Sequence, residues 1–276
     1  MSAAGASGGS GGSSPRDIEC LDLSPAPGAA PASRMVAAQA AAETRSVLRN
    51  GEQLGLTLII PLLLLGGFGA ASLVSLGTGI RRIDWVTPGI MALAVMSTAF
   101  TSQAIATGFE RRYGVLKRLG ATPLSRGQLV TAKTATVIAI ELLQAMLILL
   151  VASLMGWRPD ASLPAIVVVP LLLLLGTAAF SGLGLAMAGT LRAEATLAAA
   201  NLVYVVLLGL GGVVFPLTKF PAGVRHVLEL LPTGALSTGL RSVLAYHVAF
   251  PVGNFVTLVV WAVLAISLAA RVFRWE

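Results

Sequence analysis

Six long apolar stretches constrain this chain more than any other feature. They run approximately over residues 54–76, 88–109, 129–155, 164–188, 197–216 and 250–272. At 1.5 Å per residue, each is long enough as a helix to cross a hydrocarbon core of about 30 Å. Only 11% of the residues are charged, whereas a soluble domain carries about 25%. The sequence therefore predicts an all-α polytopic membrane protein with six transmembrane helices.

The residues ahead of the first stretch divide into two segments. Residues 1–33 are rich in Gly, Ser, Ala and Pro, and such a segment buries too little apolar surface to offset its ordering entropy, so we expect a disordered tail. It lacks the basic start and apolar core of a signal peptide, and Met35 is an alternative start. Residues 34–53 predict an amphipathic helix in the cytoplasmic interface, with Ser33 as its N-cap. The transmembrane domain then covers residues 54–276.

Local signals support the helix starts and the packing of the spans. Thr87 followed by Pro88 predicts the start of the second span. Ser125 with Gln128 three residues later predicts a capping box ahead of the third. Small residues spaced four apart predict close helix packing, and these are Gly182 with Ala186, Gly184 with Ala188, and Gly66 with Ala70.

The distribution of Lys and Arg predicts the orientation. With the N-terminus inside, thirteen of the 19 Lys and Arg residues fall in cytoplasmic segments and six in outer segments. Because short cytoplasmic loops carry the excess of basic residues, both termini are predicted to be cytoplasmic. The same placement explains the net charge of +7 without a nucleic-acid partner, since these residues face anionic membrane lipid.

The cytoplasmic loop over residues 109–128 is the most informative segment. Residues 111–119 predict a short helix with Gly120 and Pro123 at its end. Val115, Leu116 and Leu119 form an apolar edge within a basic surround. A partner that holds such a helix could move two membrane spans. An ordinary basic loop that follows the positive-inside rule explains the same residues.

This loop resembles the cytoplasmic loop of type-2 ABC exporter permeases. The resemblance rests on Glu110, then Leu119-Gly120, then Thr122-Pro123-Leu124-Ser125-Arg126, and it continues to Lys133. It implies that the loop docks onto a cytoplasmic ABC ATPase subunit, that the permease pairs with itself or a related permease, and that a bacterial plasma membrane houses the complex. The coupling residues it implies are Glu110, Arg111, Arg112, Tyr113, Val115, Leu116 and Leu119.

The long outer loop over residues 216–249 predicts two short amphipathic helices that dip into the outer leaflet. Val224, Val227, Leu228 and Leu231 follow a helical period, and Pro232 breaks the helix. The second helix places Arg241 on its polar side. A gate over the outer end of a pathway and a simple interfacial anchor both fit, and the pattern resembles the closing region of type-2 permeases. The gate residues are Leu228, Leu231, Pro232 and Arg241.

One carboxylate lies near the middle of the third span. Glu141, with Gln144 one turn later, costs about 2.5–3.5 kcal/mol on insertion scales, so it should face the bundle or be protonated. It is either a polar contact in the translocation path or between protomers, or a neutral group hydrogen-bonded to a neighbouring helix.

The residues that ATP hydrolysis, metal binding or catalysis would require are not found in the expected patterns in this sequence. None of the lysines follows a glycine in a Gly-Lys-Ser/Thr setting, so no P-loop, and no ATPase activity of this chain, is predicted. Cys20 is the single cysteine, and His226 and His247 lie far from it in the sequence. We therefore predict neither a metal site nor catalytic residues. The predicted function is the permease subunit of an exporter for a lipid-like or drug-like substrate, with ATP and Mg²⁺ on the partner. An ion-coupled secondary transporter and a non-transporting membrane scaffold are the alternatives.

Overall fold

The computed structural model describes residues 30–70, 81–159, 162–213 and 215–272. The chain separates into residues 1–30 and residues 31–276, and the fold below is that of the second unit. Most of the predicted tail, residues 71–76 of the first predicted span and the last four residues lie outside the described residues. Every regular element within the described ranges is helical, which confirms the all-α class.

The helices follow one another with short connections. Their bounds are α1 Ala32–Arg49, α2 Gly51–Ala70, α3 Arg82–Val95, η1 Met96–Ser102, α4 Gln103–Arg112, α5 Val115–Gly120, α6 Arg126–Leu154, α7 Leu163–Thr190, α8 Ala193–Leu210, η2 Leu217–Lys219, α9 Ala222–Leu230, α10 Pro232–Leu244 and α11 Val252–Val272. The elements α3, η1 and α4 form one continuous rod, in which η1 is a π-helical segment.

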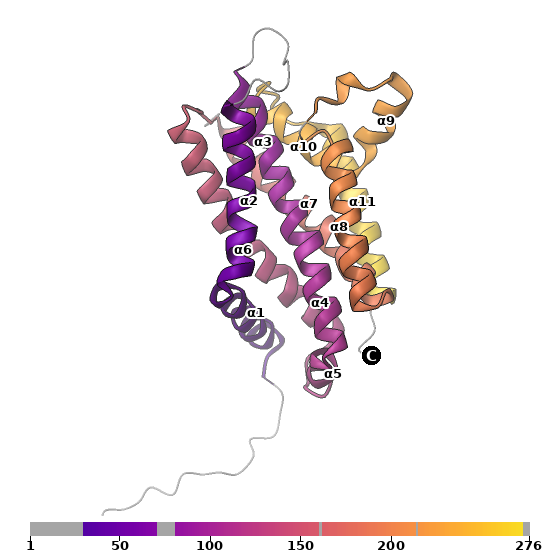
Figure 1. The fold of residues 1–276 in the computed structure, drawn as a ribbon. Helices are drawn as coiled ribbons and strands as arrows, with labels where there is room; N and C mark the ends of the chain where they lie inside the picture. Colours follow the sequence, from indigo (N-terminus) through magenta and orange to yellow (C-terminus); the bar gives the residue numbers. More distant parts are fainter. Residues whose placement is uncertain (1–29, 71–80, 160–161, 214, 273–276) are drawn as a thin grey trace, which may run out of the picture. The chain divides into compact units, whose positions relative to one another are not determined.

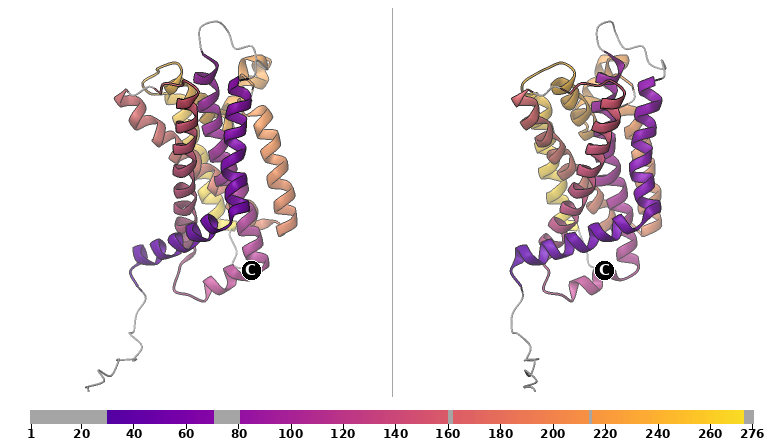
Figure 2. Two further views of the ribbon diagram at one scale, coloured as in Figure 1. Left: turned by 60° about the vertical axis from the view of Figure 1, so that its left-hand side comes forward. Right: turned by 90° about the vertical axis from the view of Figure 1, so that its left-hand side faces the viewer.

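Five of the described helical segments are long and apolar enough to cross a membrane. They are residues 82–112, 126–154, 163–190, 193–210 and 252–272. In α2 the apolar part that the structure describes is shorter, Thr57–Gly69. Nevertheless α2 runs lengthwise beside the other long helices (Figures 1 and 2).

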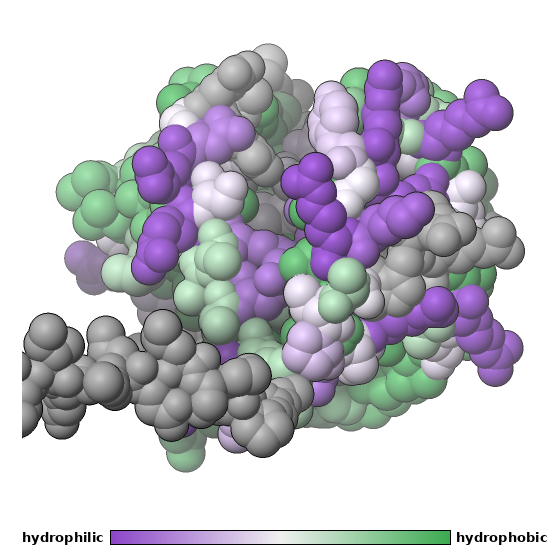
Figure 3. Space-filling model, turned by 90° about the horizontal axis from the view of Figure 1, so that it is seen from below, coloured by the Kyte–Doolittle hydropathy of each residue, from purple (hydrophilic) through white to green (hydrophobic). Residues whose placement is uncertain are grey.

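The two ends of the bundle differ in their short helices. α1 lies across the lower end in Figure 1, and α5 and the end of α11 lie there too, whereas α9 and α10 lie at the upper end (Figures 1 and 2). Seen from below, hydrophilic side chains gather over the lower end (Figure 3). We therefore call these the α5 end and the α10 end.

Two predicted helix starts are wrong. α3 begins at Arg82 after an extended Arg81, so Pro88 lies inside the helix and the Thr87 hydroxyl donates to Ile83 O instead of capping. The hydropathy pattern missed this first turn because the turn is charged. It contains Arg82 and Asp84, and Asp84 pairs with the preceding Arg81 at 2.8 Å. α1 begins at Ala32 after Pro31, so Ser33 is not its N-cap.

The capping box ahead of the third span is confirmed. The backbone N–H of Gln128 donates to Ser125 Oγ at 3.3 Å, and that of Ser125 donates to Gln128 Oε1 at 2.8 Å. Two amide donors at the start of α6 are thus satisfied by local residues alone.

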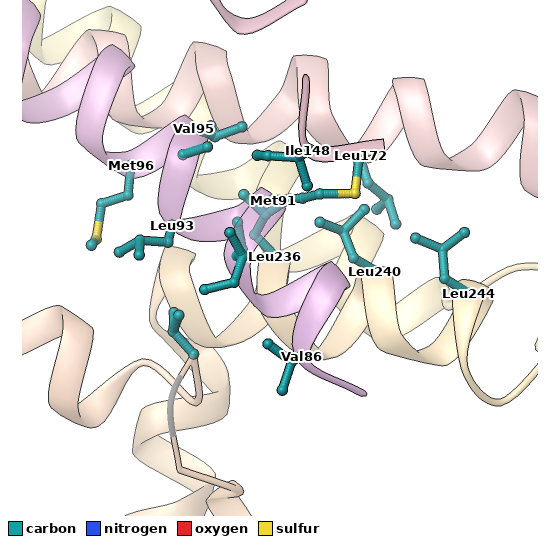
Figure 4. Packing of buried hydrophobic residues seen from close by; sticks show 14 of the residues in the cluster. Val86, Met91, Leu93, Val95, Met96, Ile148, Leu172, Leu236, Leu240 and Leu244 are labelled. Carbon is teal, nitrogen blue, oxygen red and sulfur yellow. The ribbon is translucent and has the colours of Figure 1, made fainter. Parts of the chain in front are cut away.

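The hydrophobic core is built around α3, in which twelve of the 14 residues are buried. Side chains of α6, α7 and α10 converge on it, as Met91, Ile148, Leu172 and Leu236 show (Figure 4). A span that is surrounded by protein and a span that faces lipid are both apolar, so the sequence does not distinguish them. Only the structure therefore separates the central helix from the peripheral ones.

Close helix packing is confirmed for the fourth span. A Cβ on Gly182 would lie 2.6 Å from the Ala265 carbonyl carbon of α11, and a Cβ on Gly184 would lie 2.9 Å from Phe100 O in η1. For the pair on the first span, a Cβ on Gly66 would meet no atom of the described chain within 4 Å, and the side chain of Ala70 lies outside the described part.

Candidate functional site

The connection between α4 and α5 forms a sharp corner at the α5 end. The predicted helix over residues 111–119 is interrupted, because α4 ends at Arg112 and α5 begins at Val115. Gly114 between them has φ of 71°, the left-handed region that glycine occupies without steric cost. α5 is therefore a separate short helix of six residues, set at an angle to the span.

Leu116 anchors α5 to the bundle. Its side chain is 0% exposed and packs with Leu124, Leu129, Leu185 and Ala269 from the loop, α6, α7 and α11. Leu116, which was predicted to be part of the apolar edge that a partner holds, is therefore turned toward the bundle in this conformation. Leu119 is half-buried against the same cluster.

The outward side of the α4–α5 corner and of α5, which we call the outward face, carries a different set of side chains. Tyr113 is 67% exposed and Val115 is 38% exposed, and Lys117 and Arg118 are exposed beside them. The Tyr113 ring stacks on Phe109, with 6.1 Å between centroids. An apolar patch inside a basic surround is thus presented at the tip of the bundle.

Glu110 is not on that outward face but in a partly buried ion cluster. The Lys133 ammonium, only 4% exposed, donates to Glu110 Oε2 at 2.6 Å and lies 3.3 Å from Glu43 Oε1. These residues come from α6, α4 and α1. The cluster links α1 to the span that leads into α5. Sequence reasoning missed it, because the three positions share no local spacing.

The two arginines that follow Glu110 are also used within the chain. The Arg111 guanidinium donates to Gly189 O at 2.6 Å and to Leu191 O, so it satisfies carbonyls at the end of α7. Arg112 pairs with Glu194 at the start of α8. They therefore connect α4 to the turn between α7 and α8.

A polar cleft of about 790 Å³ lies beside this turn. Its lining comes from α4, α11 and the α7–α8 turn, and it includes Arg111, Arg112, Arg192, Arg271 and Glu194. Four basic groups against one acidic group make the cleft electropositive. Its position near α5 adds a basic surface to the same end of the bundle.

Near the middle of α6, the two predicted intramembrane polar residues face neighbouring helices. The Thr177 hydroxyl of α7 donates to Glu141 Oε2. Gln144 is 2% exposed; its Oε1 accepts from Thr98 and its Nε2 donates to Thr57 O, both at 2.8 Å. Gln144 thus connects α6 to η1 and α2.

At the α10 end, Arg241 is buried rather than on an exposed polar side, which corrects the prediction. It is 4% exposed and donates to Trp85 O at 3.0 Å, to Val213 O at 2.9 Å and to Gly212 O. Burial lowers the pKa of Arg241 to about 9, so the guanidinium stays protonated at neutral pH. It joins α10 to α3 and to the end of α8.

The remaining predicted gate residues also lie inside the protein. Leu228 is 4% exposed and Pro232, the first residue of α10, is buried, while Leu231 between them is half-buried. Eleven of the 13 residues of α10 are buried, against α3, α7 and α11. The prediction of an amphipathic surface helix is therefore wrong for α10, in which Ser237, Thr238 and Arg241 donate to main-chain carbonyls of the protein.

A family model described as ABC-2 type transporter matches residues 36–245, which run from α1 to the end of α10. A search of curated proteins finds no match. The matched region includes the α4–α5 corner, the Lys133 ion cluster and Arg241.

Proposed function

Because this chain belongs to the ABC-2 type transporter family and provides its membrane-spanning permease domain, we propose that it is the permease subunit of an ATP-driven exporter. A separate cytoplasmic ABC ATPase subunit binds and hydrolyses ATP with Mg²⁺. The permease works as a dimer, with itself or with a related permease. The substrate is a lipid-like or drug-like amphiphile.

The proposed topology has six spans, with α2 as the first and both termini in the cytoplasm of a bacterial plasma membrane. The α5 end is then the cytoplasmic end, which agrees with the excess of basic residues in the segments that lie there. The α10 end faces outside, and α9 lies at the outer leaflet.

The observation that carries the proposal is the construction of α5. Tyr113 in the α4–α5 corner and Val115 at the start of α5 are exposed, whereas Leu116 on the inward face of α5 is fully buried in a cluster with residues of α6, α7 and α11. A subunit that grips the outward face therefore moves a helix whose inner face touches three spans. That is the mechanical requirement for coupling.

Coupling needs two arrangements of the bundle, and the ATP-loaded ATPase must bind one of them more tightly than the other. Closure of two ATPase subunits around ATP would pull α5, and through Leu116 the ends of the spans, toward one arrangement. The difference in ATP affinity between the inward- and outward-accessible arrangements supplies the direction. The basic cleft at Arg192 and Arg271 is placed to receive acidic side chains of the ATPase.

The test is co-purification of the ATPase with the permease. Replacing Tyr113 and Val115 together by Asp should reduce ATPase recovery at least about tenfold, since charge replaces an apolar contact at a packed interface. Ala37→Asp, on the exposed side of α1, is the matched control and should leave recovery unchanged. Substrate-stimulated ATP hydrolysis by the complex should fall in parallel with recovery.

Leu116 provides an internal comparison. Leu116→Ala should lower thermal stability, because it opens a cavity in a fully packed cluster, yet the outward face that binds the partner is kept. Full ATPase recovery with the Tyr113/Val115 double variant would refute the coupling assignment. Transport that continues without any ATPase would favour the ion-coupled alternative.

A further inference from the structure

An apolar cavity of about 520 Å³ lies between α3, α6 and α7, and its lining includes no residue of α5. Met91 and Val95 form part of its back wall, and Trp157 and Leu244 lie at its α10 end. Several lining residues on its sides, including Leu142 at 62% and Ile166 at 59%, are exposed on the outer surface of α6 and α7. The cavity therefore opens sideways between two spans.

The size and length of the cavity suit a small elongated molecule. Ligand pockets commonly measure about 300–1,000 Å³, and this cavity lies within that range. On α6 its lining runs from Ile138 to Leu149, a distance of about 16 Å along the helix axis. An apolar space of this kind is poorly suited to water, which needs polar partners.

Glu141 is the one ionisable side chain among the described residues that line this cavity. Its Oε2 accepts a hydrogen bond from the hydroxyl of Thr177, and this contact does not involve the other carboxyl oxygen. That oxygen, Oε1, is buried and has no hydrogen-bond donor within the described part of the chain. An unpaired acceptor thus lies on the wall of an otherwise apolar space.

We propose that this cavity binds an amphiphile with a protonated amine head and a hydrocarbon body. The ammonium donates to Glu141 Oε1, and the hydrocarbon lies against the apolar side chains of α3, α6 and α7. The molecule enters between α6 and α7 from the surrounding hydrocarbon. The identity of this site as a substrate site rests on the proposed function, but binding itself does not.

The chemistry of the wall selects the head group. A buried carboxylate without a cation is costly, and an ammonium that pairs with it makes a charge-assisted hydrogen bond. The hydrocarbon body gains from burial of apolar surface against the lining. An anionic head would meet like charge at Glu141 and is disfavoured, while a neutral hydroxyl lacks the charge pair.

Binding can be measured on the full chain in nanodiscs, without any ATPase. Trp157 lies in the cavity wall, so a doxyl-labelled long-chain alkylamine should quench its fluorescence. The Trp157→Phe variant lacks this fluorophore, so comparison with it identifies the part of the quenching that comes from Trp157. Glu141→Gln should weaken alkylamine binding at least about tenfold, the loss of one charged hydrogen bond, and change binding of the matching doxyl-labelled alcohol less than about twofold.

A second pair of variants tests the apolar body of the site. Val169→Phe adds bulk to the cavity wall on α7 and should weaken binding of both probes. The matched control is Val263→Phe on the exposed side of α11, where Val263 is 59% exposed, and it should change neither.

Three outcomes overturn the proposal. Alkylamine binding that survives Glu141→Gln removes the head-group assignment, and equal loss of the alcohol makes Glu141 a structural residue. A change of oligomeric state in Val169→Phe makes the cavity a contact between protomers. Because the ATPase is absent from these measurements, failure of ATPase coupling leaves them unaffected, and failure here leaves the coupling test of Tyr113 and Val115 standing.

Discussion

The guanidinium of Arg241 lies over the indole ring of Trp85, with its Cζ 3.7 Å from the ring centroid, although the two residues are 156 positions apart in the chain. The same guanidinium donates to the carbonyl of Trp85 and to two carbonyls after α8. One side chain of α10 thus connects this helix to α3 and to the segment after α8. The guanidinium satisfies main-chain acceptors in a buried place, where an unpaired carbonyl is costly.

Arg241→Met should therefore destabilise the protein strongly. The carbonyls of Trp85, Gly212 and Val213 would lose their donors, and loss of charged hydrogen bonds in a buried place costs about 2–4 kcal/mol. Thermal unfolding in detergent, followed by tryptophan fluorescence, measures the effect. Arg225→Met, at an exposed ion pair on α9, should cost less than about 1 kcal/mol. Equal effects at the two positions would contradict this account.

Gly89 should not tolerate alanine. A Cβ at this position would lie 2.8 Å from Val213 O and in contact with the Arg241 guanidinium, so Arg241 could not keep its place. We expect Gly89→Ala to lower the unfolding temperature by several degrees. Gly66→Ala in α2 is the control, because a Cβ there meets no described atom within 4 Å and the substitution favours the helix. It should leave stability unchanged or slightly higher.

The Lys133 ion cluster should behave as a coupled unit. Lys133→Met leaves Glu110 and Glu43 without their cation and should cost about 3 kcal/mol. Adding Glu110→Gln should recover part of this loss, so the double-mutant cycle should give a coupling of at least about 1 kcal/mol. The surface pair of Arg225 and Glu229 is the comparison, with a coupling below about 0.5 kcal/mol. Additive effects at Lys133 and Glu110 would show that the pair does not interact.

Gln144→Leu should cost about 1–2 kcal/mol. It removes the acceptor for Thr98 and the donor to Thr57 O, which leaves two polar groups unpaired between α6, η1 and α2. Equilibrium unfolding in mixed micelles measures the change. Asn201→Leu on α8, where the amide donates within its own helix to Leu197 O, should have a smaller effect, and the reverse order would contradict the assigned contacts.

Features that depend on a few neighbouring residues were predictable from the sequence. The capping box of Ser125 and Gln128 needs only four consecutive positions. Apolar stretches of sufficient length indicated the long helices, because apolar length depends on composition alone. The first turn of α3 was missed for the same reason, since Arg82 and Asp84 are charged although they are helical.

Features that depend on distant contacts were not predictable. Helical period placed Arg241 on a polar side, but period cannot distinguish a polar side that faces solvent from one that faces buried carbonyls. Leu116 and Val115 are adjacent apolar residues in sequence, yet the structure buries one and exposes the other. The ion cluster of Lys133 joins three helices with no shared local spacing.

The sequence by itself determined that this chain is a helical membrane protein and which short loop resembles a coupling segment, because hydrophobic length and local motifs are properties of contiguous residues. Only the tertiary structure decided which face of α5 is anchored, which helix lies at the centre and where Glu141 meets an apolar cavity. Those properties depend on which helices pack together, and packing partners in this bundle are chosen by shape and by buried polar contacts across many residues.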